Sequence, residues 1–295
     1  MIYKTFEINL NKRDGIDPQQ KPTVDYYILD TPDEMTAIRK RPMVLVCAGG
    51  AYLYRSKREG EPVIMKFLAR GYHCALVHYS VTPAKWPCAA RELAHAVKIS
   101  REHAEEWNIK TDSVFVCGFS AGGHLASTVA TIWDDPLFFE EFGCERPENL
   151  LGKKEEILWR PDGAILGYPV ITMLENTHAG SRDNVLGQGA SRERLEMASM
   201  EKRVTKASVP CFIWHTKTDG AVPVANSVDY AKALEANGIP YKLKLYETGG
   251  HGLSLCNELT STAADQIVPA NADWIDLAAD WVKERAGQLS PFEIK

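Results

Sequence analysis

The feature that most constrains this chain is the pentapeptide Gly-Phe-Ser-Ala-Gly at residues 118–122, between an apolar run and a helix-like segment. The order is strand, sharp turn and helix. A serine in such a turn is held in strained backbone geometry, and glycines flank it because the strand and the helix leave no room for side chains. Ser120 is thereby presented at a helix N-terminus, which favours developing negative charge. The pattern predicts that Ser120 is a nucleophile.

A serine hydroxyl is a poor nucleophile at neutral pH, so it needs a histidine base, and the base needs a carboxylate to orient it. Three histidines lie beyond the Ser120 turn and its helix: His178, His215 and His251. His251 follows the last expected strand in a glycine-rich loop and is the candidate base. His215 lies inside a strand and is expected to be a hydrogen-bonded core residue. Asp219 ends the strand before His251 and is the candidate acid, with a simple turn residue as the alternative.

Acyl transfer also needs backbone N–H groups that face the developing oxyanion. The apolar run at 43–47 leads into Ala-Gly-Gly-Ala-Tyr at residues 48–52, where small residues let a substrate approach the main chain. We expect this loop to supply the first donor and the amide of Ala121 to supply the second. A phosphate site after the same strand is not expected, because neither G-x-G-x-x-G spacing nor a P-loop lysine follows.

Charge and composition exclude several classes of partner. The chain has 34 Lys and Arg against 39 Asp and Glu, a net charge of −5 without a long charged run, so a small neutral molecule is a better partner than nucleic acid or a membrane. No metal-ligand spacing or cofactor motif is present, so no cofactor is expected. The seven cysteines lack C-x-x-C spacing and are expected to be buried thiols. Neither a signal-peptide core nor a membrane-length apolar stretch is apparent, which favours the cytoplasm; the oligomeric state stays open.

Strand and helix patterns alternate along the chain. β-Branched and aromatic runs predict strands at 24–29, 43–47, 73–79, 113–117, 163–166, 211–215 and 241–246, and helical periodicity predicts helices at 62–70, 88–107, 122–133, 224–236 and 272–286. This alternation predicts a mainly parallel sheet covered by helices on both faces, with residues 2–10 as an antiparallel edge. No linker divides the chain, so one domain over 1–295 is expected. Long connections at 134–160 and 172–203 are candidate lid insertions, or ordinary surface segments.

Six motifs together resemble the bacterial α/β-hydrolase esterases described as acetyl esterases or acetyl xylan esterase-like proteins. They lie at 48–52, 56–62, 118–124, 168–171, 219–224 and 249–252, and the resemblance spans about residues 40–285. It implies the α/β-hydrolase fold. The site residues that it implies are Ser120 as nucleophile, Asp219 as acid, His251 as base, and Gly50, Ala51 and Ala121 as the oxyanion hole.

The leading hypothesis for function is a serine esterase that removes a short acyl group, acetyl above all, from a carbohydrate or a similar alcohol. Bulky residues at 138–142 and Trp159, with alanines at 48 and 51, predict a short acyl pocket. A peptidase or amidase on the same triad is the first alternative. A non-catalytic binding protein with a hydrolase fold is the second.

Aromatic residues near the expected site are candidates for substrate binding because their flat apolar rings suit sugar rings, although core packing is the alternative role. The candidates are Tyr52, Tyr168 and Trp159, with Tyr54 and Trp86 as further aromatic rings. Ser56, Arg58 and Glu59 also lie close to the expected pocket, and an ion pair that closes a loop is their simplest role. His124, one helical turn after Ser120, is expected to be structural.

Overall fold

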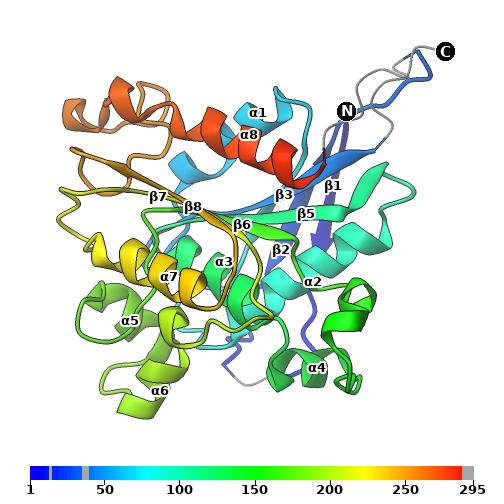
Figure 1. The fold of residues 1–295 in the computed structure, drawn as a ribbon, viewed down its shortest axis with the longest axis horizontal. Helices are drawn as coiled ribbons and strands as arrows, with labels where there is room; N and C mark the ends of the chain where they lie inside the picture. The colour runs from blue at the N-terminus through cyan, green and yellow to red at the C-terminus, as the bar shows by residue number, and fades with distance from the viewer. Residues whose placement is uncertain (13–14, 35–39, 288–295) are drawn as a thin grey trace.

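The structure is a computed structural model that describes residues 1–12, 15–34 and 40–287. Within these residues eight strands form one sheet in the order β1-β2-β4-β3-β5-β6-β7-β8 (Figure 1). The strands are β1 (Ile2–Glu7), β2 (Thr23–Ile28), β3 (Arg41–Cys47), β4 (His73–His78), β5 (Ile109–Phe119), β6 (Gly163–Gly167), β7 (Cys211–Thr216) and β8 (Tyr241–Tyr246). β1 pairs with β2 and β2 with β4 in antiparallel fashion, whereas all pairs from β4 to β8 are parallel. The predicted α/β-hydrolase sheet and its antiparallel edge are confirmed.

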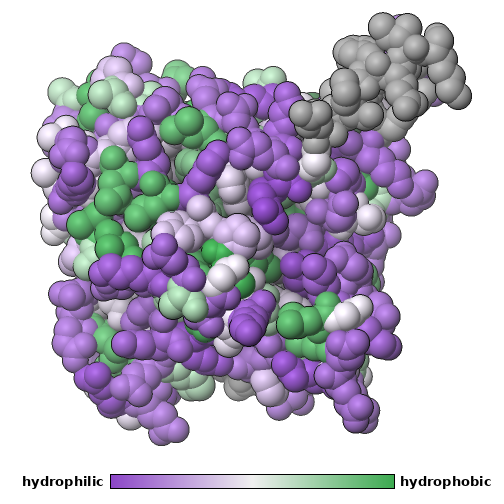
Figure 2. Space-filling view, viewed as in Figure 1, coloured by the Kyte–Doolittle hydropathy of each residue, from purple (hydrophilic) through white to green (hydrophobic). Residues whose placement is uncertain are grey.

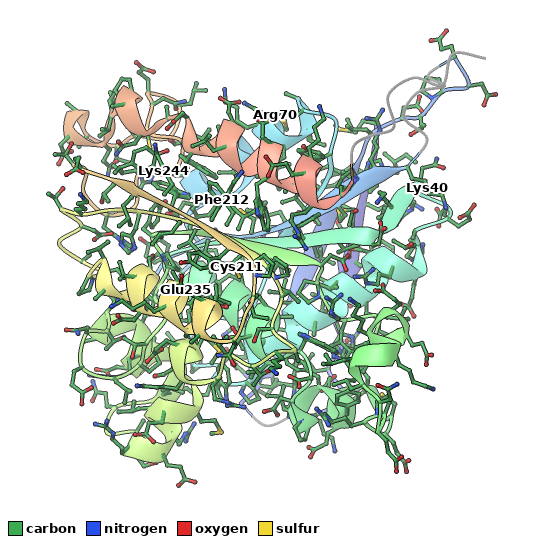
Figure 3. The ribbon with its side chains drawn as sticks, in the orientation of Figure 1. Lys40, Arg70, Cys211, Phe212, Glu235 and Lys244 are labelled. Carbon is green, nitrogen blue, oxygen red and sulfur yellow. The ribbon has the colours of Figure 1, made fainter. Side chains whose placement is uncertain are left out.

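Helices cover both faces of this sheet, because parallel strands need crossover connections. α1 (Glu61–Leu68) and α8 (Trp274–Arg285) pack on one face, and α2 (Cys88–Glu102), α3 (Ala121–Ile132) and α7 (Ala225–Ala236) on the other (Figure 1). Successive side chains of a strand point to opposite faces. Figure 3 shows this on β7, where Cys211 and Phe212 lie on opposite sides of the sheet and join different apolar cores.

The five predicted helices are present with shifted ends. α2 ends at Glu102 rather than at 107, with His103 as its C-cap, and turns at 103–108 lead into β5 at Ile109. Three short helices were not predicted: α4 (Pro136–Phe142), α5 (Ala179–Leu186) and α6 (Arg192–Met197). Helices of this length are unstable alone and depend on caps and packing. The 3-10 helices are η1 (Lys57–Glu59), η2 (Leu151–Glu156), η3 (Met200–Lys202), η4 (Ala264–Gln266) and η5 (Pro269–Asn271).

The two long connections lie at different edges of the sheet. Residues 134–160 follow α3, whose 12 residues carry the chain about 18 Å away from Ser120. The carbonyl of Arg160 then accepts a hydrogen bond from Arg101 at 2.7 Å, just before the amino end of β6. The prediction of a lid at 134–160 is therefore wrong. Residues 172–203 instead follow the carboxyl end of β6. In Figure 1 the helix α5 of this segment lies far to the left of α4, which belongs to residues 134–160.

The molecular surface in Figure 2 is mostly hydrophilic, with apolar residues in separate patches. Leu53 and Tyr54, in the loop after β3, are among the large apolar side chains that are exposed. None of the described helices combines the length and the apolarity that crossing a membrane requires.

Candidate active site

Ser120 occupies the sharp turn between β5 and α3 with a φ of +52°, a backbone conformation that costs a non-glycine residue about 1–3 kcal/mol. Its N–H donates to the carbonyl of Gly167 at 3.1 Å, which ties the turn to β6. A Cβ atom on Gly118 would lie 2.0 Å from the carbonyl oxygen of Gly122, and one on Gly122 would lie 2.2 Å from that of Cys47. The flanking glycines are therefore required by close backbone approach, as the sequence predicts.

Three loops at the carboxyl edge of the sheet bring Ser120, His251 and Asp219 into a hydrogen-bonded line. The Nε2 atom of His251 lies 2.7 Å from Oγ of Ser120, and its Nδ1 lies 2.7 Å from Oδ2 of Asp219. The other carboxylate oxygen, Oδ1, accepts from the backbone N–H groups of Ala221 and Val222, both at 2.9 Å. A carboxylate only accepts, so Nδ1 carries the proton and Nε2 is free to accept from the serine hydroxyl.

Asp219 has a second histidine partner that sequence reasoning did not identify. Its side chain is fully buried, and Oδ2 also lies 3.2 Å from Nε2 of His215, whose Nδ1 contacts Oγ of Ser227 at 2.7 Å. Burial alone would raise the pKa of Asp219, but hydrogen bonds with His215 and His251 and the charge of His251 hold it below its ordinary value. Asp219 is thus a carboxylate at neutral pH. The predicted core role of His215 is confirmed.

Two threonines hold the loops of Asp219 and His251 together. The hydroxyls of Thr216 and Thr218 donate to the carbonyl of Gly249 at 2.8 and 3.0 Å, and the N–H of Gly249 donates to Oγ1 of Thr218 at 2.9 Å. Asn271 binds the neighbouring carbonyl of Thr248 at 2.8 Å. These bonds fix the loop of His251 relative to the end of β7.

The loop after β3 presents uncommitted backbone donors. The N–H of Gly49 donates to Oε2 of Glu59 at 2.8 Å and is thereby occupied. Gly50 and Ala51 have φ values of +127° and +56°, and in the described part of the chain no hydrogen bond engages their N–H groups. Ala121 is the first residue of α3, so its N–H has no acceptor within the helix. The three donors predicted from the sequence are therefore available, and Gly49 is not.

The three aromatic residues predicted to bind substrate are buried instead. Tyr52, Tyr168 and Trp159 are 3, 1 and 4% exposed, so none of them offers a surface to a sugar ring, and this prediction is wrong. Trp159 donates to the carbonyl of Trp133 and stacks on Phe142 with ring centroids 4.5 Å apart. The bulky residues at 138–142 and Trp159 thus fill a core at the amino edge and do not limit an acyl pocket.

His124 joins three parts of the site scaffold. Its Nε2 donates to the carbonyl of Ala198 at 2.8 Å, so Nδ1 is left to accept from the hydroxyl of Tyr52, also at 2.8 Å. Both ring nitrogens are thus used by the neutral form. Burial lowers the pKa of His124 to about 4, although the bond to Ala198 acts in the opposite direction. The predicted structural role of His124 is confirmed.

This burial predicts acid destabilisation. The ordinary histidine pKa is about 6.5, so the unfolded chain binds more protons than the folded one between about pH 6.5 and 4, and the free energy of unfolding falls by about 3 kcal/mol as the pH drops through that window. Urea titrations at several pH values measure the slope. His124→Asn should be less stable at pH 7 but show a shallower fall towards pH 4. Equal slopes for both proteins would contradict the assignment.

Arg58 and Glu59 do not form the predicted ion pair. The guanidinium of Arg58 donates to the carbonyls of Gly252 and Thr260, whereas Glu59 accepts from Gly49 and Tyr168. The two side chains therefore join different loops.

The cysteines fit the predicted role of buried thiols, apart from Cys144, which is exposed. Burial raises the pKa of the Cys47 and Cys117 thiols, which are the ones nearest to the site loops in sequence. Among the described residues no group of three or more His, Cys, Asp or Glu side chains is arranged to hold a metal ion.

Known proteins resemble this chain in sequence and in fold. The model of the BD-FAE family matches residues 29–234. Endo-1,4-beta-xylanase B of Butyrivibrio fibrisolvens is 36% identical over 225 residues, which cover 74% of this chain and 33% of that protein. An acetylxylan esterase of Xylanibacter ruminicola is 28% identical over 217 residues, 72% of this chain and 41% of that protein. The chain thus spans less than half the length of these curated relatives.

The similarity to a solved structure extends over nearly the whole chain. An acetyl ester-xyloside bifunctional hydrolase from Caldicellulosiruptor lactoaceticus has a TM-score of 0.76 and 31% identity, covering 91% of this chain and 90% of that one. A carboxylesterase from Lactobacillus plantarum, at 24% identity, has a TM-score of 0.78. These matches confirm the resemblance that the motifs indicate.

Proposed function

Because the chain belongs to the BD-FAE family, we propose that it is a serine-dependent carboxylic ester hydrolase that removes short acyl groups, acetyl above all, from carbohydrate. The observation that carries the proposal is the line of two 2.7 Å contacts from Ser120 through His251 to Asp219. The relatives named for acetylxylan and acetyl ester hydrolysis support the substrate class.

In the proposed reaction Oγ of Ser120 attacks the ester carbonyl carbon while Nε2 of His251 takes its proton. Buried Asp219 stabilises the imidazolium that forms and keeps Nε2 directed at the serine. His251 then gives the proton to the leaving alcohol, and an acyl group remains on Ser120. Water then attacks the acyl-enzyme with His251 again acting as the base, and the acid is released from Ser120.

The carbonyl oxygen gains negative charge in the tetrahedral intermediate and requires fixed donors. We assign this role to the N–H groups of Gly50, Ala51 and Ala121. The first two lie in a loop that Glu59 holds at Gly49, and the third begins α3, whose dipole favours an anion at this end.

We propose that the carbohydrate extends into a groove that begins at Ala48, in the loop after β3. The groove has a volume of about 600 Å³, and its lining includes Tyr54, Leu53, Arg55 and Asp25. Tyr54 is 60% exposed and offers the flat ring that buried Tyr52 and the other two candidates do not.

The segment 172–203 is proposed to border the substrate entrance. Its Asn184 donates to the carbonyl of Ala51 at 2.8 Å, which places α5 against the oxyanion loop. We further propose that residues 1–295 form a single domain, since one sheet runs through the described part of the chain from β1 to β8.

Acyl-chain length provides the first test of the proposal. We expect kcat/KM for p-nitrophenyl acetate to exceed that for the butyrate by at least roughly 10-fold, because the similar enzymes are named for acetyl esters and a methylene that a site does not accommodate costs about 10- to 200-fold. The octanoate should be hydrolysed at a rate near background. Steady-state kinetics on the three esters measure this order. A preference for octanoate would overturn the short-acyl proposal.

A second panel separates the proposed function from its alternatives. Acetylated xylo-oligosaccharides should release acetate, and aminoacyl p-nitroanilides should not be cleaved. Faster cleavage of the anilides would favour a peptidase or amidase. Absence of turnover on both panels would favour a binding protein.

A further inference from the structure

A buried carboxylate lies between the loops of the site. Glu59 is 3% exposed, and both of its oxygens accept hydrogen bonds, Oε2 from the N–H of Gly49 at 2.8 Å and Oε1 from the hydroxyl of Tyr168 at 2.6 Å. Among the described residues no Lys, Arg or His forms an ion pair with it. Burial of a carboxylate is costly unless its partners are well placed, so these two contacts are strongly constrained.

We propose that Glu59 is a positioning residue for ester hydrolysis: its carboxylate fixes the oxyanion loop and, through Tyr168, the ring of His251, so that donors and base keep their relative places. This inference rests on the proposed function. Glu59 is not proposed to contact substrate.

The contact with Gly49 acts on the oxyanion donors. A Cβ atom on Gly49 would lie 2.8 Å from Oε2 of Glu59 and 2.9 Å from Cβ of Ser120, so this glycine is packed between the carboxylate and the nucleophile. The bond from its N–H sets the peptide plane from which the loop continues. The next two N–H groups, of Gly50 and Ala51, are thereby left free to face the substrate.

The contact with Tyr168 acts on the base. The ring of Tyr168 meets that of His251 edge to face, with centroids 5.1 Å apart and an interplanar angle of 70°. Its hydroxyl donates to Glu59 and accepts from the N–H of Ser254 at 2.9 Å. The position of the Tyr168 ring therefore depends on Glu59, and so does its packing contact with the ring of His251.

The neighbouring residue reinforces the same connection. The carbonyl of Arg58 accepts from the hydroxyl of Ser254 at 2.6 Å, and its guanidinium binds the carbonyl of Gly252, directly after His251, at 3.1 Å. The short helix η1 therefore contacts both the oxyanion loop and the loop of His251. Glu59 contacts the oxyanion loop at Gly49 and reaches the ring of His251 through Tyr168, whereas Arg58 contacts the loop of His251 itself.

Two substitutions at Glu59 test the inference. In Glu59→Gln the amide oxygen can still accept from Gly49, but its NH2 group faces the hydroxyl of Tyr168, so kcat for p-nitrophenyl acetate should fall by roughly 10-fold. In Glu59→Ala both contacts are lost and the fall should be roughly 100-fold or more. KM should stay within about twofold of wild type in both, because substrate contacts are unchanged.

Glu141→Gln is the control for burial of a carboxylate, although Glu141, unlike Glu59, also pairs with His95 at 2.8 Å. Glu141 is fully buried on α4 and accepts from the backbone N–H groups of Asn11 and Lys12 at 2.7 and 3.0 Å, away from the loops of the site. This variant should lose stability in urea titrations and keep its kcat. Equal losses of kcat in the Glu59 and Glu141 variants would show a merely structural effect and overturn the inference.

Tyr168→Phe keeps the inference testable if the Glu59 variants fold poorly, because it removes only the hydroxyl that binds Glu59. We expect its kcat to fall with an unchanged KM, and the double variant with Glu59→Gln to lose less than the product of the single losses, since both act through one contact. Wild-type kcat in Glu59→Gln or in Tyr168→Phe would contradict the inference. Failure of the proposed function is distinguishable, because the wild type itself would then hydrolyse no ester.

Discussion

Ser120→Ala is expected to lower kcat/KM for p-nitrophenyl acetate by roughly 10⁴- to 10⁶-fold while the protein stays folded. The substitution removes only Oγ, which is the atom 2.7 Å from Nε2 of His251. Alanine keeps the same Cβ at the positive φ of this turn, so no new strain arises. Steady-state kinetics and the free energy of unfolding measure the two effects separately.

Ser127→Ala is the matched control for this substitution. Ser127 is a fully buried serine on α3 whose hydroxyl donates to the carbonyl of His124 at 2.9 Å, within the helix and outside the proposed triad. It should retain turnover. Near wild-type turnover in a pure preparation of Ser120→Ala would contradict the serine mechanism.

Asp219→Asn is expected to lower kcat by roughly 10³- to 10⁴-fold with little change in KM. Because Oδ1 of Asp219 accepts from the N–H groups of Ala221 and Val222, the amide oxygen of Asn will occupy that side. The NH2 group then faces Nδ1 of His251 and can only donate to it. The imidazole proton moves to Nε2, which can no longer accept the proton of Ser120.

A carboxylate at the other edge of the sheet provides the control. Asp162→Asn changes a largely buried side chain that accepts from the N–H of Val114 at 2.8 Å and pairs with Arg101. It should reduce stability and leave kcat near wild type. Full activity of Asp219→Asn would mean that another carboxylate orients His251.

The proposed triad could be predicted from the sequence because local sterics and the order of residues along the chain determine it. The close approaches at Gly118 and Gly122 require glycine, so the turn that presents Ser120 is encoded within a few residues. Asp219 and His251 each follow a strand of the parallel sheet, and the carboxyl ends of such strands lie at one edge.

Long-range packing determined the features that the sequence did not predict. The position of 134–160 depends on the length and direction of α3, and the burial of Trp159 depends on its contact with Phe142 at the amino edge. The partners of Glu59 lie in a preceding loop and after β6, 109 residues further along the chain in the case of Tyr168. Motif spacing does not predict contacts of this kind. The motif at 56–62 therefore indicated that Glu59 lies near the site but did not predict its partners.

Covalent labelling shows which residue is the nucleophile, and we expect it to be Ser120. The intact protein is incubated with an aryl phosphonate ester that reacts with activated serines, and the modified peptide is located by mass spectrometry. We predict one phosphonyl group on Ser120 in parallel with the loss of esterase activity, no labelling of Ser120→Ala at this peptide, and much slower labelling of His251→Asn. Loss of activity with the phosphonyl group on another residue, or full activity with Ser120 modified, would contradict this prediction.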